Sequence, residues 1–168
     1  MLFLQKKNKL QCHGVIYATQ NGEIMPIEQI PDTVFAEKVL GDGVCILPSD
    51  GKVCAPISGM VDTVAESGHA YGIITEDGAN IMVHIGVDTV ELKGKGYKPK
   101  IKAGQKINIG DLLCTVDLKI IQQAGYAMHT AIILTNSDEF TATEKYYGTA
   151  VAGDTPAFHY QKSKTTAC

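Results

Sequence analysis

Short runs of β-branched and other apolar residues alternate with polar residues along most of the chain, and turn signals interrupt them at short intervals. Gly and Asp form many of these signals, as at 41–43, 76–78 and 110–111. Helical periodicity is scarce: a turn or two is expected at 118–124, whereas 33–40 stays undecided. The pattern predicts an all-β fold, an antiparallel, barrel-like β-sandwich with little helix.

One β-hairpin in this pattern brings two histidines together. Two β-prone runs flank the turn signal at 75–78, and each of the turn geometries we consider places His69 directly or diagonally across from His84. Because side chains alternate across a strand, both histidines are predicted to share a face with Tyr71 and Met82, while an apolar opposite face packs on the core. Paired imidazoles suit proton transfer, phosphoryl transfer or metal binding.

Length, charge and cysteine content narrow the class of protein. The 168 residues predict one domain over 15–160, with tails at 1–14 and 161–168. The net charge of −3 gives no reason to expect nucleic-acid or anionic-membrane binding. The apolar start of the chain is too short for a signal peptide or a membrane span. Five cysteines without C-x-x-C spacing indicate reduced thiols and a cytoplasmic protein.

Several blocks of the sequence resemble one protein family. The run Val-His-Ile-Gly-Val-Asp-Thr-Val-Glu-Leu-Lys-Gly at 83–94 resembles the signature of the glucose-type enzyme IIA domain of the bacterial phosphoenolpyruvate-dependent sugar phosphotransferase system. Further blocks follow in the family's order and spacing, at 31–43, 55–59, 69–70 and 104–111. The similarity extends over nearly the whole chain and implies an antiparallel β-sandwich with a shallow active-site depression.

The resemblance also implies a reaction, that of a phosphotransferase acting as a phosphohistidine carrier. His84 would be phosphorylated on Nε2, with its Nδ1 proton held by the backbone carbonyl of Gly86. His69 would stabilise the phosphate and the charge of the transition state, and Ser67 would orient the His69 ring. The chemistry is consistent with this, because a neutral imidazole nitrogen is nucleophilic near pH 7.

Partner proteins follow from the same resemblance. It implies that the phosphocarrier HPr donates the phosphoryl group and that a cysteine on the IIB domain of a sugar permease accepts it during sugar uptake. Asp32 and Asp88 would face a basic residue of HPr. The partners would cover an apolar surround, made of Val34, Phe35, Leu40, Tyr71 and Met82. Regulatory targets are also expected, because phosphorylation changes the local charge by about two units.

Two other functions stay open. A regulatory IIA-like module of a sugar transporter would be phosphorylated on the same histidine. A zinc-binding hydrolase would use His69 and His84 as ligands, but a catalytic zinc ion normally needs a third protein ligand, and the chain has no H-E-x-x-H motif. The phosphocarrier hypothesis requires no cofactor or metal, although zinc bridging the two histidines in a partner complex remains open.

Overall fold

The computed structural model describes residues 13–163, so most of the two predicted tails lies outside the described residues. Strands make up most of the regular secondary structure in this part of the chain. In order they are β1 (His13–Tyr17), β2 (Gly22–Pro26), β3 (Asp42–Pro48), β4 (Lys52–Cys54), β5 (Gly59–Val64), β6 (Ala70–Ile74), β7 (Asn80–Ile85), β8 (Tyr97–Pro99), β9 (Lys106–Ile107), β10 (Leu112–Val116), β11 (Thr130–Leu134), β12 (Phe140–Lys145), β13 (Gly148–Ala150) and β14 (Pro156–Lys162).

Helical segments are few and short. They are the 3-10 helices η1 (Ile27–Gln29) and η2 (Thr89–Leu92) and the α-helices α1 (Thr33–Ala36) and α2 (Leu118–Gln123). The expected turn or two at 118–124 is therefore present as α2, and the undecided segment 33–40 contains the single turn α1. None of the helices among residues 13–163 is long and apolar enough to cross a membrane.

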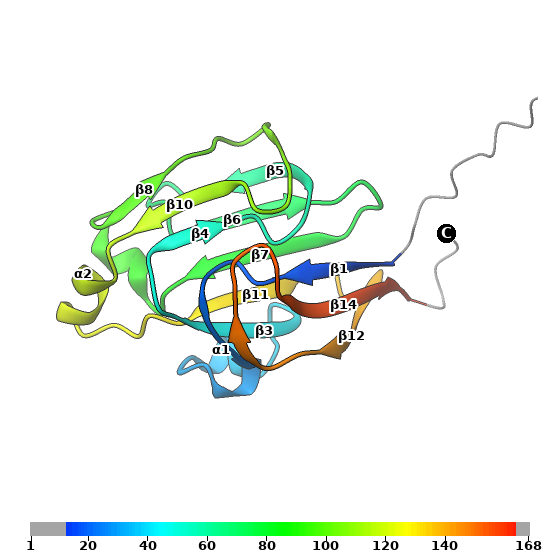
Figure 1. Cartoon of the computed structure of the whole chain (residues 1–168), viewed down its shortest axis with the longest axis horizontal. Helices are drawn as coiled ribbons and strands as arrows, with labels where there is room; N and C mark the ends of the chain where they lie inside the picture. Colours follow the sequence, from blue (N-terminus) through cyan, green and yellow to red (C-terminus); the bar gives the residue numbers. More distant parts are fainter. Residues whose placement is uncertain (1–12, 164–168) are drawn as a thin grey trace, which may run out of the picture.

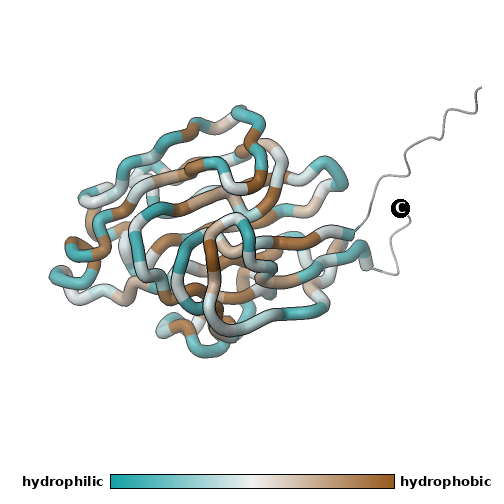
Figure 2. Tube along the Cα trace, in the orientation of Figure 1, coloured by the Kyte–Doolittle hydropathy of each residue, from teal (hydrophilic) through white to brown (hydrophobic). Residues whose placement is uncertain are grey.

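The strands form one large and two small antiparallel sheets (Figure 1). The large sheet has eight strands in the order β13-β2-β3-β11-β7-β6-β5-β9, and the small sheets have the orders β1-β14-β12 and β4-β10-β8. Hydrophobic residues recur along the strands of the large sheet and of the two small sheets (Figure 2). The predicted all-β antiparallel sandwich with little helix is confirmed.

Two apolar cores fill the space between the large sheet and the two small sheets. One core joins the β1-β14-β12 sheet to β2, β3, β7 and β11 of the large sheet and includes Ile16, Ile132 and Phe158. The other joins the β4-β10-β8 sheet to β5, β6 and β7 and includes Tyr71 and Leu113. All five of these side chains are at most 1% exposed, so both small sheets are firmly packed on the large one.

A third, smaller cluster lies on the opposite face of the large sheet. Cys45 of β3 and Ala131 and Ile133 of β11 belong to it, whereas the residues next to them on these strands point into the sandwich core. The segment with η1 and α1 covers this outer face through Ile27 and Phe35. The face would otherwise expose apolar side chains, and it is also the face that carries the candidate site.

The hairpin of β6 and β7 has a different register from the predicted one. Ile74 pairs with Asn80, so the closing loop is 75–79 and has an odd number of residues, whereas the predicted loops were all even. The Thr75 side chain explains the wider loop, because its hydroxyl oxygen accepts the Ala79 N–H at 2.9 Å and the Thr75 N–H donates to the Ala79 carbonyl at 2.9 Å. A shift of one residue moves every side chain of β6 to the other face.

The corrected register changes the predicted surface. Tyr71 pairs with Val83, faces the sandwich core and is only 1% exposed. Its predicted place among the partner-binding residues is therefore wrong. Met82, which pairs with Gly72, lies on the outer face with His84 and is half-buried.

Candidate functional site

His84 lies near the end of β7, on the outer face of the large sheet. Its neighbours across the sheet are Ala70 of β6 and Ala131 of β11, whose small side chains leave room for an imidazole. The Phe35 ring from α1 covers one side of it, with the two ring centroids 4.9 Å apart and the rings tilted by 55°. The histidine is thus half-buried in a surface that its neighbours shape around the ring.

A backbone carbonyl determines which nitrogen of His84 is protonated. Nδ1 lies 2.9 Å from the carbonyl oxygen of Gly86, and because a carbonyl can only accept, Nδ1 carries the hydrogen and donates it. Nε2 has no hydrogen-bond partner among the described residues and is not among their buried unpartnered atoms, so it is open to solvent. The lone pair of His84 therefore faces outward on Nε2.

The chain beyond His84 turns sharply to bring this carbonyl back to the ring. Gly86 has a φ of 80°, which side chains other than glycine rarely adopt. An added Cβ there would also come within 2.4 Å of Cγ2 of Thr89, so glycine is required on both grounds. Two backbone bonds, from the N–H groups of Gly86 and Val87 to the carbonyls of His129 and Ala127, tie the turn to the segment before β11.

His69 stands beside His84, although not for the predicted reason. Its ring centroid lies 5.1 Å from that of His84, and the rings meet edge to face at 82°. In the register of the hairpin, Ala70 rather than His69 pairs with His84. His69 precedes the first paired residue of β6, so strand alternation does not govern its side chain. The backbone holds it instead, because the His69 carbonyl accepts the Ile85 N–H at 2.7 Å.

Ser67 is expected to orient the His69 ring. The described residues, however, contain no hydrogen bond between these two side chains. Nδ1 of His69 is buried and has no hydrogen-bond partner there. The His69 ring instead meets the His84 ring edge to face and packs beside the Tyr97 ring, whose centroid lies 6.5 Å away. The role of Ser67 stays a prediction, whereas Tyr97 is a neighbour that the sequence analysis did not single out.

Burial sets the charge of both histidines. It lowers the pKa of His84, and the neighbouring His69 lowers it further, while the Gly86 carbonyl and the carboxylates of Asp32 and Asp88 oppose the shift. Burial also lowers the pKa of His69. Since the ordinary histidine value is about 6.5, both rings are neutral at pH 7. A neutral His84 has the free lone pair that a nucleophile needs.

Asp32 has a structural role that the sequence analysis missed. It is the N-cap of α1, and its Oδ1 accepts the backbone N–H of Val34 at 2.8 Å and of Phe35 at 3.4 Å. The cap fixes the turn that places Phe35 against His84. An Asp directly before a segment of helical propensity is a recognised N-cap signal, so the sequence contained the information.

Asp88 supplies a second carboxylate at the rim of the site. It is exposed, precedes η2 and has a φ of 58°, a left-handed conformation that Asp adopts more readily than most residues. Because the charges of both Asp88 and Asp32 raise the pKa of His84, both carboxylates lie close enough to act on its ring. The rim of the site is therefore acidic.

Exposed apolar side chains stand on α1, on the turn that follows α1 and on η2. Val34 is 42% and Leu40 41% exposed, in agreement with their expected place at the surface. Val39 and Val90 are more exposed still, at 67% and 50%, and the sequence analysis did not identify them. No periodic pattern marked them, because both lie in short, irregular segments.

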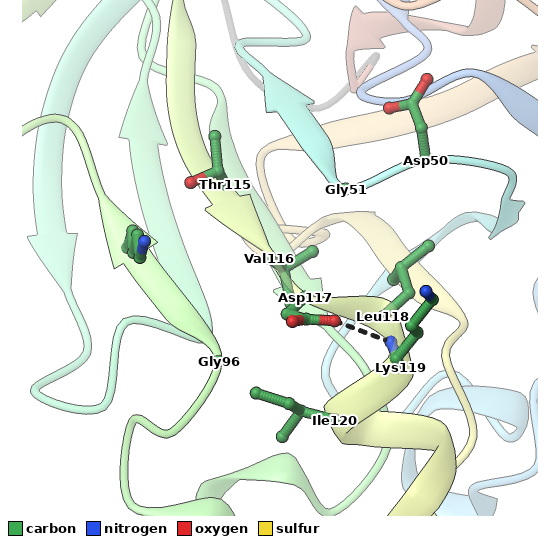
Figure 3. A pocket seen from close by; sticks show the side chains of 10 residues that line it. Asp50, Gly51, Gly96, Thr115, Val116, Asp117, Leu118, Lys119 and Ile120 are labelled. Carbon is green, nitrogen blue, oxygen red and sulfur yellow. Dashed lines mark hydrogen bonds between the residues drawn. The ribbon is translucent and has the colours of Figure 1, made fainter.

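The zinc-binding hydrolase hypothesis depends on a third ligand beside the two histidines. Residues 13–163 contain no group of three or more His, Cys, Asp or Glu side chains placed to hold a metal ion. The zinc-binding hydrolase hypothesis thus lacks its third ligand within that range. A depression of about 740 Å³ does lie between β8, β10 and the start of α2, but its lining residues, such as Thr115 and Asp117, include neither histidine (Figure 3).

Comparisons with known proteins agree with this geometry. The family model described as phosphoenolpyruvate-dependent sugar phosphotransferase system, EIIA 1, matches residues 14–140, a stretch that contains both histidines. The glucose-specific EIIA component of this system from Buchnera aphidicola (subsp. Acyrthosiphon pisum) is 40% identical over 140 residues, which are 83% of this chain and 87% of that protein. The glucose-specific EIICBA component from Streptococcus pneumoniae is 42% identical over 123 residues, which are 73% of this chain and 17% of that protein.

A solved structure shares the fold. The glucose permease IIA from Mycoplasma capricolum superposes with a TM-score of 0.81 at 34% sequence identity, covering 95% of this chain and 99% of that one. The match to the family model spans most of the sequence, and the relatives align over most of this chain. The chain therefore belongs to the EIIA 1 family of the phosphoenolpyruvate-dependent sugar phosphotransferase system.

Proposed function

We propose that this chain is a phosphocarrier in sugar uptake, in which His84 accepts a phosphoryl group on Nε2 and passes it to a second protein. One observation carries the proposal: Nδ1 of His84 donates to the Gly86 carbonyl at 2.9 Å, which leaves the Nε2 lone pair facing outward. A ring held in this tautomer needs no proton transfer before it attacks phosphorus. The phosphoryl group is bound covalently, so the function requires no cofactor.

The same hydrogen bond helps after the attack. As Nε2 bonds to phosphorus and the bond to the donor breaks, positive charge develops on the imidazole ring. The Gly86 carbonyl then accepts a hydrogen bond from a more acidic Nδ1–H, and such charge-assisted bonds are about twice as strong as neutral ones. The contact therefore stabilises the phosphorylated ring more than the free one.

His69 supplies a hydrogen-bond donor beside the transferring group. An N–H at its buried Nδ1 would have no acceptor among the described residues, so we place the proton on Nε2. From there, at the side of His84, it donates to a phosphoryl oxygen. In a loose transition state, where charge spreads over the three equatorial oxygens, such a donor lowers the barrier.

The surface around the histidines supports two successive protein partners, with HPr as donor and a cysteine of a IIB domain as acceptor. The acidic rim of Asp32 and Asp88 complements a basic partner, and exposed Val39 and Val90 suit apolar contact. The EIICBA relative has a name that joins an A to a B component in one protein, which supports the IIB acceptor. We place the reaction in the cytoplasm, in keeping with the free thiols of the described cysteines.

The proposal is tested by intact-protein mass spectrometry at mildly alkaline pH, after incubation with phosphoenolpyruvate, enzyme I and HPr. We expect one added phosphate that requires HPr and disappears in acid. It should be absent from His84→Ala and present in the control His13→Ala, which removes an exposed histidine of β1. An acceptor IIB domain should then remove it. A chain that takes up no phosphate, or a His84→Ala variant that still does, contradicts the proposal.

A further inference from the structure

Two buried hydroxyl groups converge on the carbonyl of Ile85, the residue between His84 and Gly86. The Tyr97 hydroxyl donates to this oxygen at 2.9 Å and the Thr89 hydroxyl at 2.7 Å. Tyr97 is 7% exposed and Thr89 is fully buried. A carbonyl oxygen has two lone pairs, so these donors satisfy it completely and fix its direction.

The fixed carbonyl belongs to the peptide unit that leads into the turn at Gly86. Its other end is also held, because the Gly86 N–H donates to the His129 carbonyl at 2.9 Å. The next peptide unit is held by the bond from Val87 N–H to the Ala127 carbonyl at 3.0 Å. The peptide units on both sides of the Gly86 Cα are therefore fixed, and the second of them aims the Gly86 carbonyl at Nδ1 of His84. The buried hydroxyls are therefore part of the device that selects the tautomer.

Tyr97 also reaches the second histidine. Its ring meets the His69 ring at 75° with the centroids 6.5 Å apart. The Ile85 N–H, on the residue whose carbonyl Tyr97 binds, donates to the His69 carbonyl at 2.7 Å. Burial raises the pKa of Tyr97 to about 12, so its hydroxyl stays a donor throughout the physiological range. Tyr97 thus binds the peptide unit that leads into the Gly86 turn and also packs against the His69 ring.

We propose that Tyr97 is a positioning residue for phosphoryl transfer: through the Ile85 carbonyl it holds His84 in the Nδ1-protonated form, and through ring contact it holds His69 beside it. Thr89 shares the first task but does not contact His69 through an aromatic ring. The inference rests on the proposed function of His84. Tyr97 is buried on the core side of the site, so it positions the reacting groups and does not itself touch a partner.

The variant Tyr97→Phe removes the hydroxyl and keeps the ring. Long-range ¹H–¹⁵N NMR of the unphosphorylated chain reports which nitrogen of His84 is protonated. We expect the ratio of Nδ1-protonated to Nε2-protonated His84 to fall about fivefold, the factor that corresponds to one hydrogen bond of about 1 kcal/mol. We also expect kcat for phosphoryl transfer from HPr to fall, because a turn that is held less firmly positions Nε2 of His84 and the neighbouring His69 less well. KM should stay unchanged, because the partner does not contact Tyr97.

A matched control distinguishes positioning from a general loss of core stability. Tyr71 is also buried, and its hydroxyl lies near the Cys114 thiol but has no partner with hydrogen-bond geometry within residues 13–163. Tyr71→Phe therefore removes the same atom and loses at most a weak thiol contact away from Ile85. It should leave both the tautomer ratio and kcat unchanged. Thr89→Val, which removes the other donor, should shift the His84 tautomer ratio in the same direction as Tyr97→Phe.

The His84 tautomer ratio and kcat together show whether the positioning role of Tyr97 is wrong or the proposed function itself is wrong. If Tyr97→Phe keeps the tautomer ratio of the unaltered chain, or changes it while kcat stays the same, the positioning role is wrong. If the unaltered chain itself accepts no phosphate from HPr, the proposed function is wrong, and the tautomer ratio still shows whether Tyr97 orients His84.

Discussion

The turn at Gly86 offers the sharpest test of how the site is built. Gly86→Ala places a Cβ on a residue with a φ of 80° and brings that atom within 2.4 Å of Cγ2 and 3.0 Å of Oγ1 of Thr89. Thr89 cannot move away freely, because it is fully buried and its hydroxyl donates to the Ile85 carbonyl at 2.7 Å. The substitution therefore adds backbone strain and a steric conflict at the same place.

Two separate costs determine the expected loss of stability. A left-handed backbone costs alanine about 1–2 kcal/mol relative to glycine. Crowding of a tightly packed site typically costs about 1–3 kcal/mol more. We therefore expect Gly86→Ala to lower the free energy of unfolding by about 2–5 kcal/mol, and Tm by about 10 °C for a chain of this size.

Two further variants separate these costs in urea unfolding. Gly110→Ala is the control for strain alone, because Gly110 has a φ of 85° and an added Cβ would meet nothing within 4 Å. We expect it to cost only about 1–2 kcal/mol. Thr89→Ser removes Cγ2, the atom in the closest conflict at 2.4 Å, and keeps the hydroxyl at 3.0 Å, so in its background Gly86→Ala should cost the strain and little of the crowding. The coupling free energy in this double-mutant cycle is then about 1–3 kcal/mol.

The same variant should disturb the chemistry. A displaced Gly86 carbonyl no longer accepts the Nδ1–H of His84 at 2.9 Å, so phosphoryl acceptance from HPr should slow in Gly86→Ala and stay normal in Gly110→Ala. The reasoning is refuted if Gly86→Ala costs no more than Gly110→Ala, or if its coupling to Thr89→Ser stays below about 0.5 kcal/mol.

Three further predictions concern the side chains around the ring. Asp32→Ala should lower the free energy of unfolding in urea by about 1 kcal/mol because α1 loses its cap, whereas Asp32→Asn should keep the cap. Both variants should associate with HPr more slowly than the unaltered chain at low salt, because both remove the charge. Association at the rate of the unaltered chain at low salt would contradict the charge argument. His69→Gln should still accept phosphate but transfer it to IIB more slowly, by about 10²-fold if one transition-state donor is lost, and a normal transfer rate would exclude that role. Burial lowers the pKa of His84 and of His69, so both should titrate below pH 6.5 by NMR, and midpoints above 6.5 would contradict this. Between pH 6.5 and these lowered pKa values the folded chain binds fewer protons than the unfolded chain, so the free energy of unfolding should fall on acidification through that window. Phosphoryl acceptance should fall as the pH drops through the lowered pKa of His84.

The sequence predicted the architecture because the signals for it are local and repeated. Short alternating runs with Gly and Asp between them define strands and turns wherever they occur, so the sandwich and the short helix at 118–124 could be expected. The proximity of the two histidines was also expected. The register was not, because it depends on the Thr75 side chain, which accepts a backbone N–H within the loop and widens it by one residue.

Other features of the site could not be read from local pattern. Tyr71 and Tyr97 are both aromatic residues in β-prone segments. The Tyr71 hydroxyl has no hydrogen-bond partner among residues 13–163, whereas the Tyr97 hydroxyl binds the carbonyl of Ile85, twelve residues before it. Contacts of this kind depend on how the sheets pack. The packing of Phe35 on His84 likewise brings together α1 and β7, far apart in sequence. Only the Asp32 cap was available from the sequence and missed.

In the mechanism that we propose, His84 carries the phosphoryl group on Nε2 because the Gly86 carbonyl holds Nδ1. The most direct measurement is NMR of the chain with ¹⁵N-labelled histidine after phosphorylation by phosphoenolpyruvate, enzyme I and HPr. Our account predicts a ³¹P–¹⁵N coupling to Nε2 of His84 and a proton retained on its Nδ1. A phosphoryl group on Nδ1 of His84, or on another histidine, would contradict it.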